Sequence, residues 1–208
     1  MPTPANEVTR AIVPVRVSIM TVALILLAVA LYRWRLELAS GLIPFLQIMV
    51  ELCEHRFDVE KFNVLTGGNE LLFSLRLTAA HPVQVFGNRL PGMDVSATTL
   101  VTHLLLDLWI YGAVLSAGIA LTPMRITRLI PVALAGCCLL CWLDIPLVLL
   151  GSIEGLLAEH LAPDQLASNP LVWWTRFLSG GGRMVLALGL GLGVLALGTA
   201  PDESACPP

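Results

Sequence analysis

Residues 95–121 read VSATTLVTHLLLDLWIYGAVLSAGIAL, an apolar run in which His103 and Asp107 are the only His, Asp, Glu, Lys or Arg residues. A helix needs about 20 mostly apolar residues to cross the hydrocarbon core of a bilayer, which is about 30 Å thick. The run is long enough and therefore predicts a membrane-spanning helix. Its imidazole and its carboxyl group would lie inside the membrane, where ionisable side chains are costly and usually functional.

The composition of the whole chain agrees with a lipid environment. Of its 208 residues, 56% are hydrophobic and 13% are charged, and its mean hydropathy is +0.81. A soluble domain has about a quarter charged residues, so this chain has too few to cover a water-facing surface. A soluble globular enzyme and a disordered chain are excluded, and the formal net charge of −3 excludes a basic nucleic-acid binder. We predict an all-α polytopic membrane protein, a single membrane domain over residues 1–208 with the lipid bilayer as partner.

Apolar runs predict about four transmembrane helices, at residues 13–32, 95–121, 129–150 and 184–200. Asp94 or Ser96 could cap the first turn of the second helix. Pro146 could end the third helix early and leave Asp144 near the membrane interface. The first run has an alternative interpretation as a cleaved signal peptide, because its apolar core ends in Ala28-Val29-Ala30.

The arginines predict an orientation in the membrane. Arg125 and Arg128 lie in the shortest loop, and short loops rich in Lys and Arg are typically cytoplasmic. Arg10 and Arg16 near the N-terminus agree with this placement. The arginines that flank spans on the opposite side are Arg33, Arg35, Arg89 and Arg183. We expect a multi-pass protein of the bacterial cytoplasmic (inner) membrane with both termini in the cytoplasm.

Residues 36–94 are predicted to form an insertion between the first two spans. Within residues 36–55 one polar stripe contains Gln47, Glu51, Glu54 and His55, which is typical of an amphipathic helix along the membrane interface or on the edge of the bundle. Residues 58–65 and 70–78 then alternate apolar and polar side chains around Thr66-Gly67-Gly68-Asn69, a pattern that predicts a small extracytoplasmic β-hairpin. Residues 83–86 could add a third strand.

Polar residues within the spans form the candidate site. His103 and Asp107 are four residues apart and share a helix face with Thr99 and Tyr111, while Asp144 lies in the third span. We expect this face to point at protein, with a hydrogen bond between His103 and Asp107. One interpretation is a proton-handling or catalytic pair completed by Asp144. The other is a polar seam that fixes the register of the helices.

Other motifs indicate packing and not chemistry. Small residues four apart allow close helix contact, and the last span has two such pairs, Gly189 with Gly193 and Ala187 with Gly191. Cys137, Cys138 and Cys141 are too few for a zinc site, which needs four ligands, so no metal or cofactor is predicted. A solvated face is expected for Glu154, Glu159, His160 and Asp164.

The order of these elements resembles that of compact members of the exosortase/archaeosortase family, membrane transpeptidase-like enzymes that process surface proteins. The segments concerned are LELASGLIPFLQIMVELCEHRF (36–57), DVEKFNVLTGGNELLFSLRL (58–77) and LTPMRITRLI (121–130). The family uses a Cys, an Arg and a His near the outer ends of successive spans. Here residues 91–96 contain no Cys, Asp144 stands where the Arg is expected, and residues 173–176 contain no His. The resemblance therefore implies a non-catalytic, exosortase-associated membrane protein.

Three hypotheses of function follow. The first is a non-catalytic accessory subunit of a membrane system for protein processing, sorting or export, bound to another integral membrane protein. The second is a small oligomeric transporter coupled to protons or ions through His103, Asp107 and Asp144. The third is an intramembrane enzyme with Asp107 and Asp144 as an acid pair.

Overall fold

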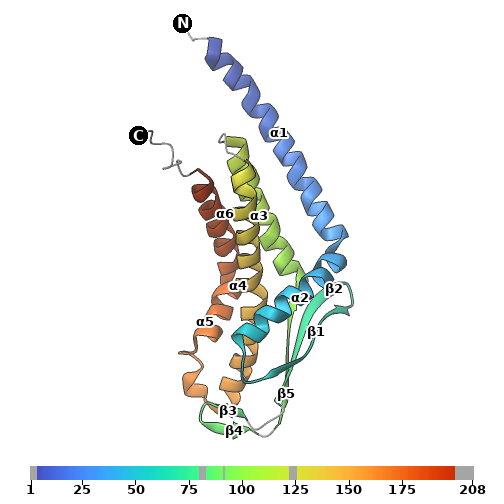
Figure 1. Ribbon diagram of the computed structural model, residues 1–208, viewed down its shortest axis with the longest axis vertical. Coiled ribbons are helices and arrows are strands. Elements are labelled where there is room, and N and C mark those ends of the chain that lie inside the picture. Colours follow the sequence, from blue (N-terminus) through green and yellow to red (C-terminus); the bar gives the residue numbers. More distant parts are fainter. Residues whose placement is uncertain (1–3, 80–82, 91, 122–125, 200–208) are drawn as a thin grey trace, which may run out of the picture.

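Most of the chain is helical in the computed structural model, which describes residues 4–79, 83–90, 92–121 and 126–199. Its main helices are α1 (Pro4–Arg33), α2 (Arg35–Cys53), α3 (Val101–Leu121), α4 (Ile126–Leu161), α5 (Pro170–Phe177) and α6 (Arg183–Thr199). Helices α3, α4 and α6 contact one another and run along the long axis, with α1 packed obliquely against α3 (Figure 1). The strands lie at the end of this bundle opposite to the start of α1.

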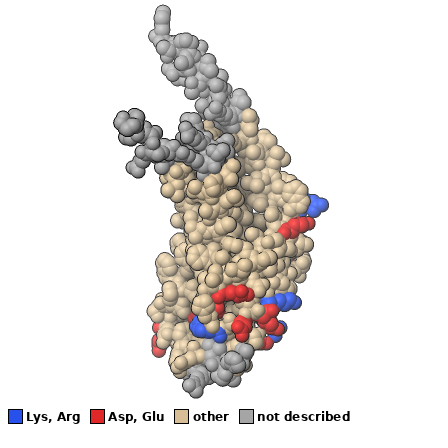
Figure 2. Space-filling model, viewed as in Figure 1, with Lys and Arg blue, Asp and Glu red and all other residues tan. Residues whose placement is uncertain are grey.

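Among the described residues, four helical segments are long and apolar enough to cross a membrane: Arg35–Cys53, Val101–Ala120, Leu129–Leu161 and Pro170–Gly198. The first predicted span lies within α1, whose side chains are described from Ser18 on and whose apolar part is the shorter Ser18–Arg33. On the face shown in Figure 2, the described charged residues gather in the half that contains the sheet, and the remainder is free of them. Among the described residues, this division is what a bundle covered by lipid requires when its sheet end faces water.

Helix α2 turns back from α1 and lies across the sheet end of the bundle (Figure 1). Its buried residues Ala39, Leu46 and Val50 belong to a core shared with the strands and α4. On the predicted polar stripe, Gln47 Nε2 donates a hydrogen bond to Glu51 Oε1 at 2.9 Å. The helix therefore packs on the edge of the bundle, which is one of the two predicted placements. Its position at a membrane interface stays a prediction.

The predicted hairpin forms and belongs to a larger sheet. Strands β1 (Asp58–Gly67) and β2 (Glu70–Thr78) are antiparallel, and Gly67 pairs with Glu70 around a two-residue turn in which Gly68 has a φ of +64°. Every second residue of β2, from Leu71 to Leu77, is buried against the core. The predicted third strand instead forms β3 (Val83–Val85), which pairs with β4 (Asn88–Leu90) in a separate two-stranded sheet.

The third strand of the main sheet is β5 (Asp94–Leu100), in the order β1-β2-β5. The prediction that a helix starts near residue 95 was therefore wrong, and neither Asp94 nor Ser96 is a helix cap. Ala97 and Thr99 are buried whereas Ser96 and Thr98 are exposed, so this segment has the two-residue period of a strand. Helix α3 follows at Val101 without a loop.

Helix α4 is continuous over 36 residues, about 54 Å, and passes through both of its prolines. The prediction that Pro146 could end it was wrong. A proline inside a helix leaves the carbonyl four residues earlier without its donor. Next to that carbonyl, the carbonyl oxygen of Leu143 accepts a hydrogen bond from Trp174 Nε1 at 2.8 Å, which braces the helix against α5. Asp144 consequently lies in the interior and not at the end of a helix.

The two predicted small-residue pairs of α6 face in different directions. Ala187 and Gly191 are buried, and a Cβ at Gly191 would lie 2.8 Å from Cγ1 of Val114 on α3. Gly189 and Gly193 are exposed, with no described heavy atom within 4 Å of a Cβ placed there. Only the first pair is thus used for packing within the described chain.

Some predicted features lie outside the described residues. They are the turn at 122–125, the final residue of the last span, and the side chains of Arg10, Arg16, Arg89 and Arg128. The orientation deduced from these arginines stays a prediction.

The different surroundings of the glycines give a matched pair of substitutions. Gly191→Leu should destabilise the protein by about 1–3 kcal/mol, because the new side chain overlaps Val114 in a packed interface. Gly193→Leu places the same side chain on an open face and should leave the stability of the purified chain unchanged. Thermal unfolding in detergent checks both, and equal losses would contradict the packing described here.

Candidate functional site

The helices α3, α4 and α6 enclose a buried group of ionisable side chains. Arg183, the first residue of α6, donates from Nε to Oδ1 of Asp144 on α4 at 2.7 Å. The side chain of Arg183 is 12% exposed and that of Asp144 is 0% exposed. A charge-assisted hydrogen bond of this kind compensates the cost of burying both ions only when the remaining polar atoms are also satisfied.

Several polar atoms of this group are not satisfied. Asp107 of α3 is 0% exposed, and it interacts electrostatically with Asp144 and Arg183 across the helix interface. Within the described part of the chain, no hydrogen-bond partner is found for either carboxylate oxygen of Asp107, for Asp144 Oδ2 or for His103 Nδ1. The predicted hydrogen bond between His103 and Asp107 is therefore absent. The charged groups that interact electrostatically with Asp107 lie on other helices, so its carboxyl group faces across the interface and not along its own helix.

The polar face of residues 99–111 points at protein, as predicted. Thr99 and Tyr111 are buried at its two ends. Tyr111 Oη donates a hydrogen bond to the carbonyl oxygen of Ala133 at 2.7 Å, and its ring lies against Gly136, which leaves no room there for a side chain. Thr99 belongs to β5 and not to the helix. We call His103, Asp107, Asp144 and Arg183 the buried charge cluster.

Sequence reasoning missed Arg183, which it treated as a charge flanking a span. A kink at Leu178–Gly182, between α5 and α6, places this residue, and Gly181 within the kink has a φ of +103°. That backbone conformation favours glycine because other side chains meet the backbone there. The sequence did contain a signal for such a cation. It predicted two acids inside the membrane and no cation to pair with them, and a buried carboxylate requires a partner or a proton.

A second ion-pair network ties α2 to α4 and α5. Arg56 bonds both carboxylate oxygens of Glu54, at 2.9 and 2.7 Å, and also bonds Glu154. Glu154 Oε2 further accepts a hydrogen bond at 3.3 Å from Asn169, whose Oδ1 caps the start of α5. Both glutamates are buried, so the solvated face predicted for Glu154 was wrong. The other members of that predicted face, Glu159, His160 and Asp164, are exposed.

Arg56 also controls the ionisation of its neighbour. Burial raises the pKa of Glu54, but the hydrogen bonds from Arg56 and its charge outweigh that effect and leave the pKa below the ordinary 4.5. Folding stability from this ionised group is therefore present above about pH 4.5 and is lost as the pH falls through the lowered pKa. The pKa of Arg56 is raised by the same hydrogen bonds.

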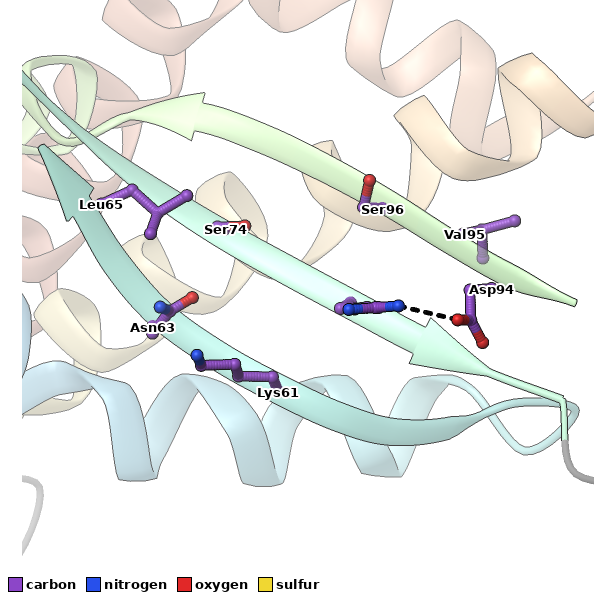
Figure 3. A pocket seen from close by; sticks show the side chains of 8 residues that line it. Lys61, Asn63, Leu65, Ser74, Asp94, Val95 and Ser96 are labelled. Atoms are coloured by element: carbon purple, nitrogen blue, oxygen red, sulfur yellow. Dashed lines mark hydrogen bonds and ion pairs between the residues drawn. The ribbon is translucent and has the colours of Figure 1, made fainter. Parts of the chain in front are cut away.

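The outer face of the sheet carries a shallow polar trough of about 380 Å³ (Figure 3). Its polar lining residues are Lys61, Asn63, Ser74, Arg76, Asp94 and Ser96. Arg76 in the middle strand forms ion pairs of 2.8 Å with Asp94 and with Glu60 on either side. The hydrogen bond from Arg76 lowers the pKa of Asp94, which is consequently ionised at neutral pH.

The cysteines and carboxylates do not form a metal centre in the described residues, where no group of three His, Cys, Asp or Glu side chains converges. The described cysteines are free thiols. The absence of a resident metal or cofactor stays a prediction.

Comparison with known proteins found no matching family, no similar curated protein and no similar solved structure. The resemblance to the exosortase/archaeosortase family therefore stays a prediction that depends on the order of elements.

The buried ion pair gives a test of what holds the bundle together. Asp144→Leu should destabilise the protein by about 3–5 kcal/mol, because Arg183 then remains buried without the carboxylate to which it is hydrogen-bonded. The double variant Asp144→Leu/Arg183→Leu should regain most of that loss, since no unpaired charge is left. Unfolding in detergent measures both, and additive losses would contradict a direct pair.

The ion-pair network at Arg56 gives a second test, in which the loss of stability should depend on pH. Arg56→Met should destabilise the protein by about 2–3 kcal/mol at neutral pH, because two buried carboxylates lose their cation. Without Arg56, burial is the largest remaining influence on the pKa of Glu54 and raises it. Glu54 can then take up a proton, so the loss of stability should shrink on acidification. Arg76→Met is the matched control on the exposed sheet and should cost much less, because ion pairs exposed to solvent contribute little to stability. A loss independent of pH would argue against this account.

Proposed function

We propose that this chain is a non-catalytic integral membrane subunit that assists a membrane enzyme or exporter of surface proteins. The observation that carries the proposal is that several charged side chains of this chain are paired with one another. Arg183, Arg56 and Arg76 each bond carboxylates of their own chain, and Asp144 is among those carboxylates. Such pairs stabilise a structure and leave these groups unavailable to a substrate.

The burial of the acids supports this proposal over the two alternatives. An acid-pair enzyme and a proton- or ion-coupled transporter both need carboxylates that a substrate or an ion can reach. Asp107 and Asp144 are wholly buried by the chain itself, and Arg183 occupies one oxygen of Asp144. We therefore interpret the buried charge cluster as a polar seam that sets the packing of α3, α4 and α6.

The proposed contact with a partner lies on α6. Gly189 and Gly193 form an exposed small-residue face, beside Val185 and Leu192, while the opposite face of the helix packs within the chain. In membranes, small residues four apart allow a second helix to approach closely. The polar sheet at the end of the bundle offers a second contact outside the lipid, so one partner could be held by both parts.

The resemblance to the exosortase/archaeosortase family implies what kind of partner this is. Residues 36–130 follow the order of elements in that family, and the positions of its Cys, Arg and His hold other residues. We accordingly propose a transpeptidase-like or export enzyme of the bacterial inner membrane as the partner. The sheet of β1, β2 and β5 would face the extracytoplasmic side, where surface proteins are processed.

Site-specific crosslinking tests the proposal. A photoreactive amino acid at Gly193 should yield one crosslinked product with another polytopic membrane protein in native membranes, whereas the same group at Ala23, an exposed residue of α1, should not. Gly189→Leu/Gly193→Leu should reduce co-purification of that protein at least about tenfold, because added side chains hold the helices apart. Ala23→Leu is the matched control and should leave co-purification unchanged.

The proposal fails if crosslinking at Gly193 reaches only lipid and the chain purifies alone from native membranes in mild detergent. It also fails if the captured protein binds the double glycine variant as well as it binds the wild type.

A further inference from the structure

We propose that the junction of α3, α4 and α6 is a binding site for a single proton, held on Asp107 and shared with Asp144. The proposal does not depend on the accessory function, because it concerns only the interior of this chain.

The charges of the junction do not balance without such a proton. Asp107 comes from α3, Asp144 from α4 and Arg183 from α6, so two carboxylates face one guanidinium. With both acids ionised, the interior of the bundle would hold a net negative charge away from water, which is very costly. One added proton makes the group neutral.

The unpaired atoms show where the proton belongs. Arg183 bonds Asp144 Oδ1, and this fixes Asp144 as the ionised member of the pair. Both oxygens of Asp107 and Oδ2 of Asp144 are buried and lack a partner among the described residues. An ionised carboxylate can only accept hydrogen bonds, whereas a protonated one also donates. A proton on Asp107 supplies the donor that Oδ2 of Asp144 lacks.

Other groups around the junction compete less well for this proton. His103 of α3 also lies near Arg183 and Asp144, with exposed Glu70 of β2 as a further charge in range. Its Nδ1 makes no bond to Asp107 in the described structure, and a charged imidazole would be repelled by Arg183. A metal cation meets the same repulsion and would need more oxygen ligands than the two carboxylates provide. The proton is the smallest cation that fits.

Infrared spectroscopy of the full-length chain in detergent tests the proposal. At about pH 5.5, where an ordinary Asp is almost fully ionised, the spectrum should contain the carbonyl band of one protonated carboxylic acid. The band should shift when the protein is made with ¹³C-labelled aspartate, and this arm requires no variant to fold. It should disappear in Asp107→Asn and persist in Asp94→Asn, which removes an exposed carboxylate.

Stability gives an independent readout. Asp107→Asn should keep the unfolding temperature of the wild type, because a neutral amide replaces a neutral acid and retains a donor. Asp144→Asn should lower it clearly, because Arg183 loses the ionised carboxylate to which it is hydrogen-bonded. The proposal is overturned if no labelled band is found at about pH 5.5, or if the band survives in Asp107→Asn. It is equally overturned if stability depends on sodium when sodium is exchanged for choline, since a metal ion would then occupy the site.

Discussion

The ion pair between Arg183 and Asp144 is the constraint on which the arrangement of the long helices depends. It joins the start of α6 to the middle of α4 at 2.7 Å, inside a bundle whose outer surface is apolar. A lipid-facing position for either side chain would be very costly, so the pair permits only those packings in which both point inward. Helix α3 must then present its own polar face, with Asp107, to the same point. The apolar surfaces alone would allow many rotations of these helices.

The sequence was informative wherever a single periodicity ran through a whole element. Alternating side chains on either side of Gly67-Gly68 predicted the β1–β2 hairpin with nearly its observed bounds. The apolar runs predicted α3, α4 and α6 because the membrane requirement leaves few other structures for so long a run. The inward direction of Asp107 and Tyr111 followed from the cost of placing polar groups in lipid.

The missed features are those that depend on contacts between distant segments. Residues 94–100 resemble the start of a helix because an apolar run follows them, and only pairing with β2 reveals a strand. Arg183 and Arg56 each lie next to a helix end, where a basic side chain usually faces water. Their carboxylate partners Asp144 and Glu154 are 39 and 98 residues away in the sequence. The pattern of neighbouring residues does not reveal contacts between segments so far apart.

The direct junction between β5 and α3 has a mechanical consequence. Leu100 ends the strand and Val101 begins the helix, so no flexible loop absorbs motion between them. Asp94 at the far end of the strand is held by Arg76 on the open face of the sheet, and His103 lies only a few residues into the helix. A force applied to the sheet would therefore pass from β5 directly into α3, with no intervening loop to absorb it. The sheet and the buried charge cluster are in this respect mechanically coupled, because one uninterrupted stretch of strand and helix joins them.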